Sequence, residues 1–156
     1  MNSALAKSEA LLNGFDEAIL FTDGGYVSEA SAANLFLVRE DKLITPPVTA
    51  DILEGITRST LMTLAEEGGR AVIERPVHRS ELYVADEVLL CGTATEVAPV
   101  IEIDHRAIGD RTPGAITRSL ARRFNEIARG TTDDHRDWLV PVGSLRSDAS
   151  APSDPM

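Results

Sequence analysis

Short apolar segments broken by glycine and proline turns restrict the fold of this chain more than any other feature. Residues 18–22 read AILFT and run into Asp23-Gly24-Gly25, a typical hairpin turn because glycine accepts the positive φ that such turns demand. Two more β-prone segments follow at 34–38 and 43–45. Pro46-Pro47 then interrupts the sheet, since proline cannot donate to a strand ladder. This opening predicts an antiparallel meander of short strands.

Helical patterns lie before, between and after the strands. Residues 3–13 favour a helix, and residues 55–67 carry an apolar stripe. A last helix is expected after Pro113, with Thr112 as its cap and Gly130 as its stop. The remaining elements are expected to be strands at 71–77, 87–91 and 96–103 and a short helix at 80–85. This irregular alternation indicates an α+β or mixed α/β fold rather than a doubly wound parallel sheet.

The length of 156 residues corresponds to one domain. We expect this domain to span 1–142, because serine, aspartate, alanine and proline dominate 143–156 and predict a disordered tail. The net charge of −10 argues against a nucleic-acid-binding protein, whose affinity depends on neutralising phosphates. No apolar run approaches the roughly 20 residues that cross a bilayer, and the first residues lack a secretory pattern. A cytoplasmic protein with no membrane partner is therefore expected.

Glu29 is a carboxylate between two apolar, β-prone segments. Burying such a charge without a partner is costly. The residue fits a solvated turn with an incidental glutamate. It also fits a carboxylate at a strand end that faces a cationic ring or a metal. Glu29 alone leaves both interpretations open.

Two further segments have the character of anion sites. Leu53-Glu-Gly-Ile-Thr-Arg58 places a glycine and a hydroxyl at a helix start, where unpaired N–H groups and the macrodipole favour negative charge. Gly92-Thr93-Ala94-Thr95 joins two apolar strands and offers amides and hydroxyls to a phosphate or carboxylate. Each also fits an ordinary connection, and most helix starts bind only water.

Other kinds of chemistry lack support in the sequence. His78, His105 and His135 show no metal-ligand spacing, so no metal site is expected. Neither a Gly-x-Ser-x-Gly elbow nor a GxGxxG motif after a strand is present. The single cysteine, Cys91, is expected to be a buried thiol rather than a nucleophile.

In their order and spacing, these segments resemble the class IV pyridoxal-phosphate-dependent aminotransferases, and the branched-chain amino-acid aminotransferases most closely. The segments that carry the resemblance are Glu29, Asn34-Leu-Phe36, Leu43-Ile-Thr45, Leu53 to Arg58, Gly92 to Val97, Ala98-Pro-Val100, Ile108-Gly-Asp110, Pro113-Gly-Ala-Ile-Thr117 and Asp137-Trp-Leu139. The resemblance covers about residues 2–142. It implies the larger carboxy-terminal, cofactor-binding domain of a fold-type IV aminotransferase, with short-stranded sheets and flanking helices.

The resemblance also implies roles for individual residues toward pyridoxal 5′-phosphate. Glu29 would face the pyridine nitrogen and keep it protonated, so that the ring acts as an electron sink. Leu53 would pack on the ring. Ile56 and Thr57 would hold the 5′-phosphate at the helix start.

The turn between the two later strands would serve both cofactor and substrate. Thr93 would add its hydroxyl to the phosphate, and the amides at Thr93 and Ala94 would receive the substrate carboxylate. The implied partners are small amino acids and 2-oxo acids. A homo-oligomer is expected where the amino-terminal domain of the family is also present.

The family's catalytic lysine, which forms a Schiff base with the cofactor, has no counterpart in the sequence. Asn2 to Ala6 resembles the family segment that comes after that lysine, so the position of the lysine would fall before Met1. Lys7 belongs to a helix beyond it, and Lys42 to a surface turn. We therefore assign no catalytic residue and expect an incomplete enzyme that does not transaminate alone.

The activity implied for the family is amino-group transfer between branched-chain amino acids and 2-oxoglutarate. A D-amino-acid transaminase is an alternative, because it shares the positions of Glu29 and Thr57. An aminodeoxychorismate lyase fits the Thr93 to Glu96 loop poorly. A non-catalytic protein that binds pyridoxal phosphate weakly is the alternative from another class.

Overall fold

The structure, a computed structural model, describes residues 2–140. These residues belong to two compact units, one ending at Asn125 and the other beginning at Glu126. In the second unit, Arg136–Trp138 form a short 3-10 helix, η2, and the rings of His135 and Trp138 stack with centroids 3.7 Å apart. The tail predicted at 143–156 lies outside the described residues, and the domain limits expected from the sequence stay a prediction.

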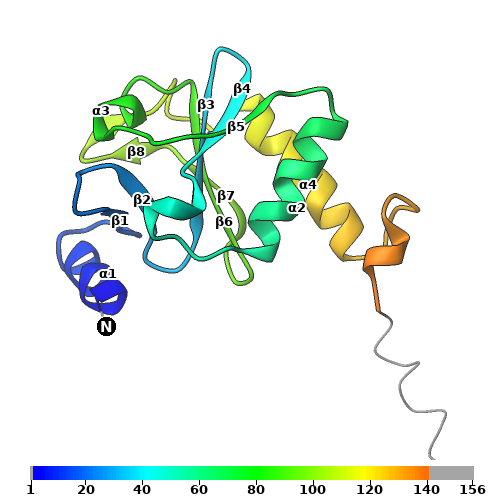
Figure 1. The fold of residues 1–156 in the computed structure, drawn as a ribbon, viewed down its shortest axis with the longest axis horizontal. Coiled ribbons are helices and arrows are strands. Elements are labelled where there is room, and N and C mark those ends of the chain that lie inside the picture. Colours follow the sequence, from blue (N-terminus) through cyan, green and yellow to red (C-terminus); the bar gives the residue numbers. More distant parts are fainter. Residues whose placement is uncertain (1, 141–156) are drawn as a thin grey trace, which may run out of the picture. The chain divides into compact units, whose positions relative to one another are not determined.

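A five-stranded sheet with the order β5-β4-β3-β6-β7 forms the centre of the first unit (Figure 1). Its strands are β3 (Asn34–Arg39), β4 (Lys42–Thr45), β5 (Val72–Glu74), β6 (Glu87–Gly92) and β7 (Glu96–Val100). Neighbouring strands are antiparallel except β4 and β5, which are parallel. The crossover between these two contains helix α2 (Ile56–Glu67). Sheets and flanking helices together give an α+β fold, as the sequence predicts.

Two small antiparallel pairs accompany this sheet. One pairs β1 (Ile19–Phe21) with β2 (Val27–Ala30), and the other pairs β8 (Glu102–Ile103) with β9 (Arg106–Ala107). The prediction of one continuous meander is wrong at residues 31–33. There the chain turns, with the N–H of Ala30 bonded to the carbonyl oxygen of Ala33 at 2.8 Å, so that β2 and β3 belong to different sheets.

Two predicted strands are shorter than expected. The strand expected over 71–77 pairs only at Val72–Glu74, because Val77 beyond it turns to β2 and accepts the N–H of Val27 at 2.8 Å. The strand expected over 96–103 is divided between β7 and β8.

The other helices are α1 (Asn2–Leu12), α3 (Arg79–Leu82), α4 (Ala115–Ala128) and the 3-10 helix η1 (Val48–Ala50). Helices α1 and α4 match those predicted at 3–13 and after Pro113. Helix α1 has no buried residue, and Leu5, Leu11 and Leu12 are exposed on it. Among residues 2–140, no helix combines the length and the apolar character that a membrane span requires.

Helix α4 is capped by a residue from a distant strand. Glu87, the first residue of β6, accepts the backbone N–H of Ile116 at 3.0 Å and that of Thr117 at 2.8 Å. It also accepts the Thr117 hydroxyl at 2.7 Å. Thr112 bonds to Asp110 instead, through its N–H and its hydroxyl. The prediction of Thr112 as the cap is wrong, because a carboxylate from the sheet satisfies the first turn of the helix.

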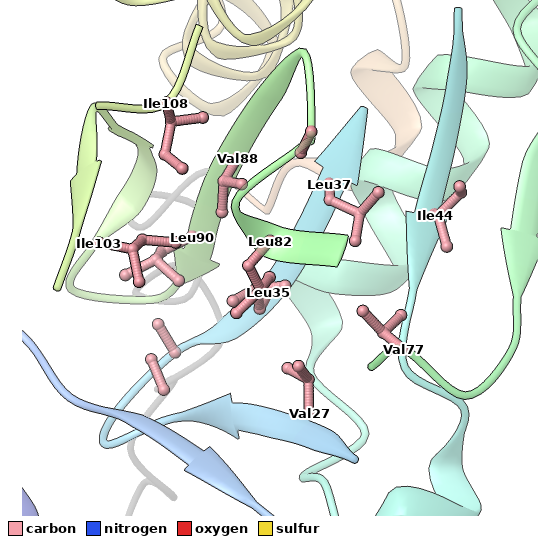
Figure 2. Close-up of a cluster of buried hydrophobic side chains, with 13 residues drawn as sticks. Val27, Leu35, Leu37, Ile44, Val77, Leu82, Val88, Leu90, Ile103 and Ile108 are labelled. Atoms are coloured by element: carbon pink, nitrogen blue, oxygen red, sulfur yellow. The ribbon is translucent and has the colours of Figure 1, made fainter. Parts of the chain in front are cut away.

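Strand β3 is buried on both faces and forms the middle of the core. Leu35 and Leu37 point to one face, where they meet Ile44, Val88, Leu82 and the other members of the largest buried cluster (Figure 2). Since side chains alternate along a strand, Phe36 and Val38 point to the opposite face. Helix α2 contributes its buried residues Leu61, Leu64 and Ala65 and contacts β5 and β6. The apolar face of α2 thereby packs against the sheet.

Candidate functional site

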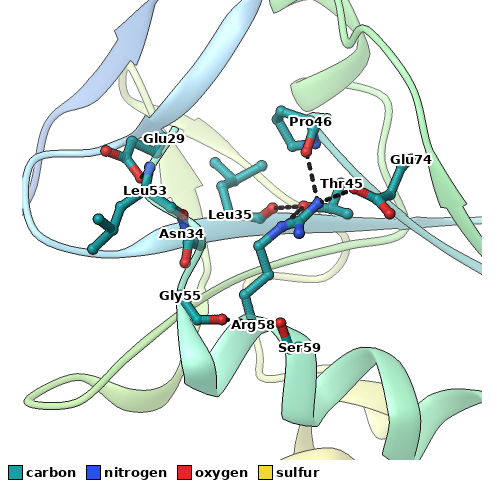
Figure 3. Close-up of polar contacts among 10 residues, drawn as sticks. All are labelled: Glu29, Asn34, Leu35, Thr45, Pro46, Leu53, Gly55, Arg58, Ser59 and Glu74. Carbon is teal, nitrogen blue, oxygen red and sulfur yellow. Dashed lines mark hydrogen bonds and ion pairs between the residues drawn. The ribbon is translucent and has the colours of Figure 1, made fainter. Parts of the chain in front are cut away.

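Asn34 is a buried polar side chain at the first position of the central strand β3, where only 5% of its surface is exposed. Its Nδ2 atom donates to Oε2 of Glu29 at 2.9 Å and to the carbonyl oxygen of Leu53 at 2.8 Å. The N–H of Leu53 donates to the same Oε2 at 3.1 Å. These three residues form a closed hydrogen-bonded group that joins β2, β3 and the loop before α2 (Figure 3).

The Glu29 carboxylate is held in this group by neutral donors. Both hydrogen bonds use Oε2; within residues 2–140, Oε1 accepts no hydrogen bond and the carboxylate forms no ion pair. Burial raises the pKa of the Glu29 carboxyl, and the bonds from Leu53 and Asn34 oppose that rise. The carboxylate is therefore oriented but not neutralised, and Oε1 can accept a hydrogen bond from a cationic N–H group.

A close approach at Gly55 connects this group to helix α2. A Cβ atom at position 55 would overlap Oδ1 of Asn34, so a residue with a side chain does not fit there without a shift. The first helical hydrogen bond runs from the N–H of Ser59 to the carbonyl oxygen of Gly55 at 3.0 Å. In the described chain, the amides of Ile56 and Thr57 before it have no acceptor. Helix α2 thus begins beside Asn34 with open donors and the positive end of its dipole.

Thr57 adds a hydroxyl to this open turn. The residue is 8% exposed, and its hydroxyl makes no hydrogen bond to any other described residue. Since no side-chain oxygen or nitrogen in residues 2–140 is both fully buried and unpaired, this hydroxyl reaches the surface. A hydroxyl beside unpaired amides is a donor set that suits a phosphate or carboxylate oxygen.

The start of α2 is anchored to the sheet by Arg58. Its guanidinium is almost fully buried and bonds to Oε2 of Glu74 at 2.6 Å and to the carbonyl oxygen of Pro46 at 3.0 Å. Its Nε donates to the Thr45 hydroxyl at 3.3 Å, and that hydroxyl donates to the carbonyl oxygen of Leu35 at 2.8 Å. The chain of contacts ties the first turn of α2 to β3, β4 and β5 (Figure 3).

The turn between β6 and β7 lies at the same end of the sheet. Cys91 pairs in register with Asn34, so Gly92 follows immediately beyond it. A Cβ atom at Gly92 would lie 3.3 Å from the carbonyl oxygen of Ala32, a tight contact between this strand end and the turn after β2. Thr93, the next residue, is exposed in the turn. Glu29, the α2 start and this turn therefore border one end of the sheet.

The six residues predicted to bind cofactor and substrate differ in their contacts. Glu29 and Leu53 bond to each other directly, while the Leu53 side chain is 74% exposed. Ile56, with 87% of its surface exposed, and the buried Thr57 follow Gly55. Thr93 and Ala94 are exposed beside Gly92. The structure brings all six to the same end of the sheet, and their roles toward a ligand stay predictions.

Two residues that shape this region have no role predicted from the sequence. Asn34 lies in a segment that carries the resemblance to the family, but its contact with Glu29 depends on the turn at 31–33 and its contact with Leu53 on the loop before α2. From the sequence, Arg58 is only the last residue of the segment 53–58, with no role of its own. The available signal is a polar residue at the start of an apolar strand, since such a residue needs hydrogen-bond partners once it is buried.

The two lysines of the sequence are engaged elsewhere. Lys7 on α1 donates to the carbonyl oxygen of Asp16 and pairs with Glu17 at 3.0 Å. Lys42 pairs with Glu40 at 3.6 Å. Lys42 also lies opposite Arg39, at the end of β3 remote from Asn34.

Cys91 is fully buried at the end of β6, which confirms the expectation of a buried thiol. Burial raises the pKa of this thiol to about 12, so the nucleophilic thiolate is scarce at neutral pH. Among residues 2–140, no three His, Cys, Asp or Glu side chains are grouped to hold a metal ion.

Comparison with known proteins gives consistent matches for this chain. Residues 1–103 match the family described as amino-transferase class IV. A probable branched-chain-amino-acid aminotransferase of Aquifex aeolicus is 51% identical over 143 residues, covering 91% of this chain and 46% of that protein. A branched-chain-amino-acid aminotransferase of Pseudomonas aeruginosa is 42% identical over 142 residues, with the same coverage.

A solved structure also matches this chain. The branched-chain amino acid aminotransferase of Thermobaculum terrenum in its PLP form is 46% identical, with a TM-score of 0.88 over 91% of this chain and 47% of that one. The chain spans about half the length of the relatives it matches.

Proposed function

The chain belongs to the class IV aminotransferases, and from this premise we propose that it supplies the cofactor-binding part of an amino-group transfer between branched-chain amino acids and 2-oxoglutarate. The observation that carries the proposal is Glu29, a carboxylate held by neutral donors with Oε1 free in the described chain, beside the open first turn of α2. Relatives named as branched-chain aminotransferases favour this substrate class over the D-amino-acid alternative.

The donor set fits pyridoxal 5′-phosphate at both ends of the molecule. Oε1 of Glu29 is an anionic acceptor for a protonated pyridine nitrogen. The amides of Ile56 and Thr57 and the Thr57 hydroxyl are donors for the phosphate that have no partner in residues 2–140. The exposed Leu53 side chain lies between these two groups in the sequence and is available to cover the ring.

When bound, the cofactor supplies an electron sink for the reaction at the substrate α-carbon. The residues of this chain have a supporting role in that chemistry. Glu29 keeps the ring nitrogen protonated, because an adjacent anion favours the cationic form. Thr57 and the α2 amides fix the phosphate, and the amides of the exposed residues Thr93 and Ala94 are available to the substrate carboxylate. Orientation of both ligands is then set by loops anchored on a rigid sheet.

Neither lysine of this sequence has the contacts of a catalytic residue. Lys7 is held by Glu17, and Lys42 lies near Arg39 at the remote end of β3. We therefore propose that the chain binds the cofactor without a covalent bond, and that turnover requires a lysine that it does not supply. A protein that only binds pyridoxal phosphate, without catalysis, is the second candidate, and these same lysine contacts favour it.

Binding is tested with pyridoxine 5′-phosphate, which lacks the aldehyde and so does not react with exposed lysines. Calorimetric titration of the purified chain is expected to show saturable binding that inorganic phosphate weakens by competition. Glu29→Gln removes the anion and is expected to weaken binding of pyridoxine 5′-phosphate but not of inorganic phosphate. Glu54→Gln, at an exposed acid in the same loop, is the control and leaves both unchanged. Equal binding by wild type and Glu29→Gln would contradict the proposed site.

Catalysis is tested separately. The purified chain with pyridoxal 5′-phosphate, leucine and 2-oxoglutarate is expected to form no glutamate above the rate of free cofactor. Turnover by the chain alone would overturn the proposal that it does not supply the catalytic lysine.

A further inference from the structure

The two oxygens of the Glu29 carboxylate have different surroundings. Oε2 receives both hydrogen bonds, from Asn34 and from Leu53, whereas Oε1 receives none from residues 2–140. We infer that Asn34 is a positioning residue that reserves Oε2 for the protein and thereby presents Oε1 to the ring N–H of a pyridinium ligand. This inference rests on the proposed function, because it takes Glu29 to face such a ring.

A single side-chain amide connects the two groups that must be held. One NH2 group of Asn34 reaches Oε2 of Glu29 at 2.9 Å and the carbonyl oxygen of Leu53 at 2.8 Å. An NH2 group has two donor hydrogens, so it can satisfy both acceptors at once. Leu53 returns its own N–H to Oε2, which closes the group. A hydroxyl has only one donor hydrogen, and an ionised carboxylate has none.

The orientation of the Asn34 amide is fixed by the position of its oxygen atom, Oδ1. Its Oδ1 atom lies against Gly55, at the place where a Cβ atom would stand. With the oxygen toward Gly55, the NH2 group is directed toward Glu29 and Leu53. Asn34 is also buried in β3 and paired in register with Cys91, so its backbone cannot follow a movement of the loop. The lack of a side chain at position 55 therefore sets the direction in which the amide donates.

The neutrality of Asn34 matters for the ligand. An arginine or lysine at this place would form an ion pair with Glu29 and neutralise the charge that a pyridinium requires. An amide orients the carboxylate and leaves its charge available. No ionised side chain contributes to the shifted pKa of Glu29, whose causes are burial and the two neutral hydrogen bonds.

The first test needs no ligand. The carboxyl carbon of Glu29 is followed by NMR during a pH titration of the purified chain and of Asn34→Ala. Loss of a donor that favours the charged form is expected to raise the proton affinity of Glu29 roughly tenfold. Asn13→Ala, which removes an exposed asparagine bonded to the carbonyl oxygen of Glu9, is expected to leave it unchanged. An unchanged Glu29 titration in Asn34→Ala overturns the inference.

Gly55→Ala provides a second variant in which Asn34 itself is retained. The new methyl group would displace Oδ1 of Asn34 and turn the amide away from Glu29. A rise in the Glu29 proton affinity, in the same direction as in Asn34→Ala, supports the inference. Wild-type titration in a folded Gly55→Ala chain, with folding checked by urea unfolding, counts against it. If Asn34→Ala does not fold, the Gly55→Ala variant alone tests the positioning role of Asn34.

A second readout reports on the ring and separates the inference from the proposed function. Pyridoxine 5′-phosphate labelled with 15N at the ring shows by NMR whether the bound nitrogen is protonated, at a pH where the free ring is not. The wild type is expected to bind it protonated and Asn34→Ala to bind it largely unprotonated. A protonated ring in Asn34→Ala overturns the positioning role. A residue with a purely structural role would not change the protonation of the bound ring. Absence of binding by the wild type overturns the proposed function, and the Glu29 titration then judges the inference by itself.

Discussion

Helices α2 and α4 carry the same four residues in their first turns and have opposite surroundings. Ile56-Thr57-Arg58-Ser59 opens α2, and Ile116-Thr117-Arg118-Ser119 lies in the first turn of α4. In α4 the Glu87 carboxylate occupies the amides and the threonine hydroxyl. In α2 the corresponding amides and hydroxyl have no partner among residues 2–140. One terminus is closed by the protein, and the other is open to a ligand.

A glycine precedes each terminus for a different purpose. A Cβ atom at Gly114 would overlap the Glu87 carboxyl group, so this glycine admits the cap. A Cβ atom at Gly55 would overlap Oδ1 of Asn34, whose donors point to Glu29 and Leu53 rather than to the helix. The side chain that approaches a helix start therefore decides whether its amides are capped or left open. The local sequence of the helix does not.

The arginines of the two turns differ most strongly, and they offer the largest expected effect. Arg58 is buried with three partners, whereas Arg118 is exposed and bonds only to the carbonyl oxygen of Pro113 among the described residues. Arg58→Met is expected to lower the free energy of unfolding by about 3 kcal/mol, because buried acceptors lose their charged donor. Arg118→Met is expected to change it by less than about 0.5 kcal/mol. Urea unfolding measures both, and equal losses would contradict the difference between the turns.

Removing the cap makes α4 resemble α2. Glu87→Ala leaves two amides and a hydroxyl unpaired and is expected to lower the free energy of unfolding by about 2 kcal/mol. Glu66→Ala, at an exposed acid on α2, serves as the control and is expected to have little effect. Urea unfolding of both variants is the measurement. A loss no larger than that of the control would mean that the carboxylate does not close the helix.

The two threonines separate stability from binding. Thr117→Val removes a hydrogen bond to Glu87 and is expected to cost about 1 kcal/mol of stability without altering ligand binding. Thr57→Val removes a hydroxyl that has no partner in the described chain. We expect it to leave stability nearly unchanged and to weaken pyridoxine 5′-phosphate binding about tenfold, as the loss of a hydrogen bond to a charged group implies. Urea unfolding and calorimetry are performed on both variants. A stability loss in Thr57→Val together with a binding loss in Thr117→Val would contradict the difference between the two helix starts.

The smallest expected effect concerns Glu29, the acid beside the open terminus. Burial raises its pKa in the folded chain, so its ionised form opposes folding. Such a group contributes most stability below the unfolded pKa and loses that contribution as the pH rises through the folded pKa. Glu29→Gln is therefore expected to gain stability over the wild type as the pH rises through this range, and the gain disappears in acid. Unfolding curves at several pH values, with Glu54→Gln as the control, would show a constant difference if Glu29 were fully solvated.

Elements that depend on local patterns can be predicted from the sequence. The apolar stripe of α2 and the turn at Asp23-Gly24-Gly25 are local, and both are present in the structure. Glu29 is a candidate site residue because its charge has no local explanation. Its assignment to a site shared with Leu53 and the α2 start comes from the resemblance to a family.

Features that depend on distant contacts cannot be predicted in this way. Thr112 is the expected cap of α4 because it precedes the helix, and nothing near it indicates that Glu87 arrives from β6. The separation of β2 from β3 depends on three small residues at 31–33, which are compatible with a strand or a turn. The partners of Asn34 likewise come from two separate segments. In the first and third cases the deciding contacts join separate segments of the chain, and in the second the local sequence does not distinguish a turn from a strand.

The parallel pairing of β4 with β5 has a consequence for the order in which the chain assembles. Strand, helix and strand lie within residues 42–74, so this unit closes over a short stretch of chain. The pairing of β3 with β6 joins residues 49 to 57 positions apart in the sequence, against 29 for β4 with β5, and closing the longer loop costs more chain entropy. We expect the open turn of α2, anchored by Arg58 to this early unit, to exist before β6 brings Gly92 and the second turn beside it. The α2 start, which we propose for the phosphate, would then form before the turn that we propose for the substrate carboxylate.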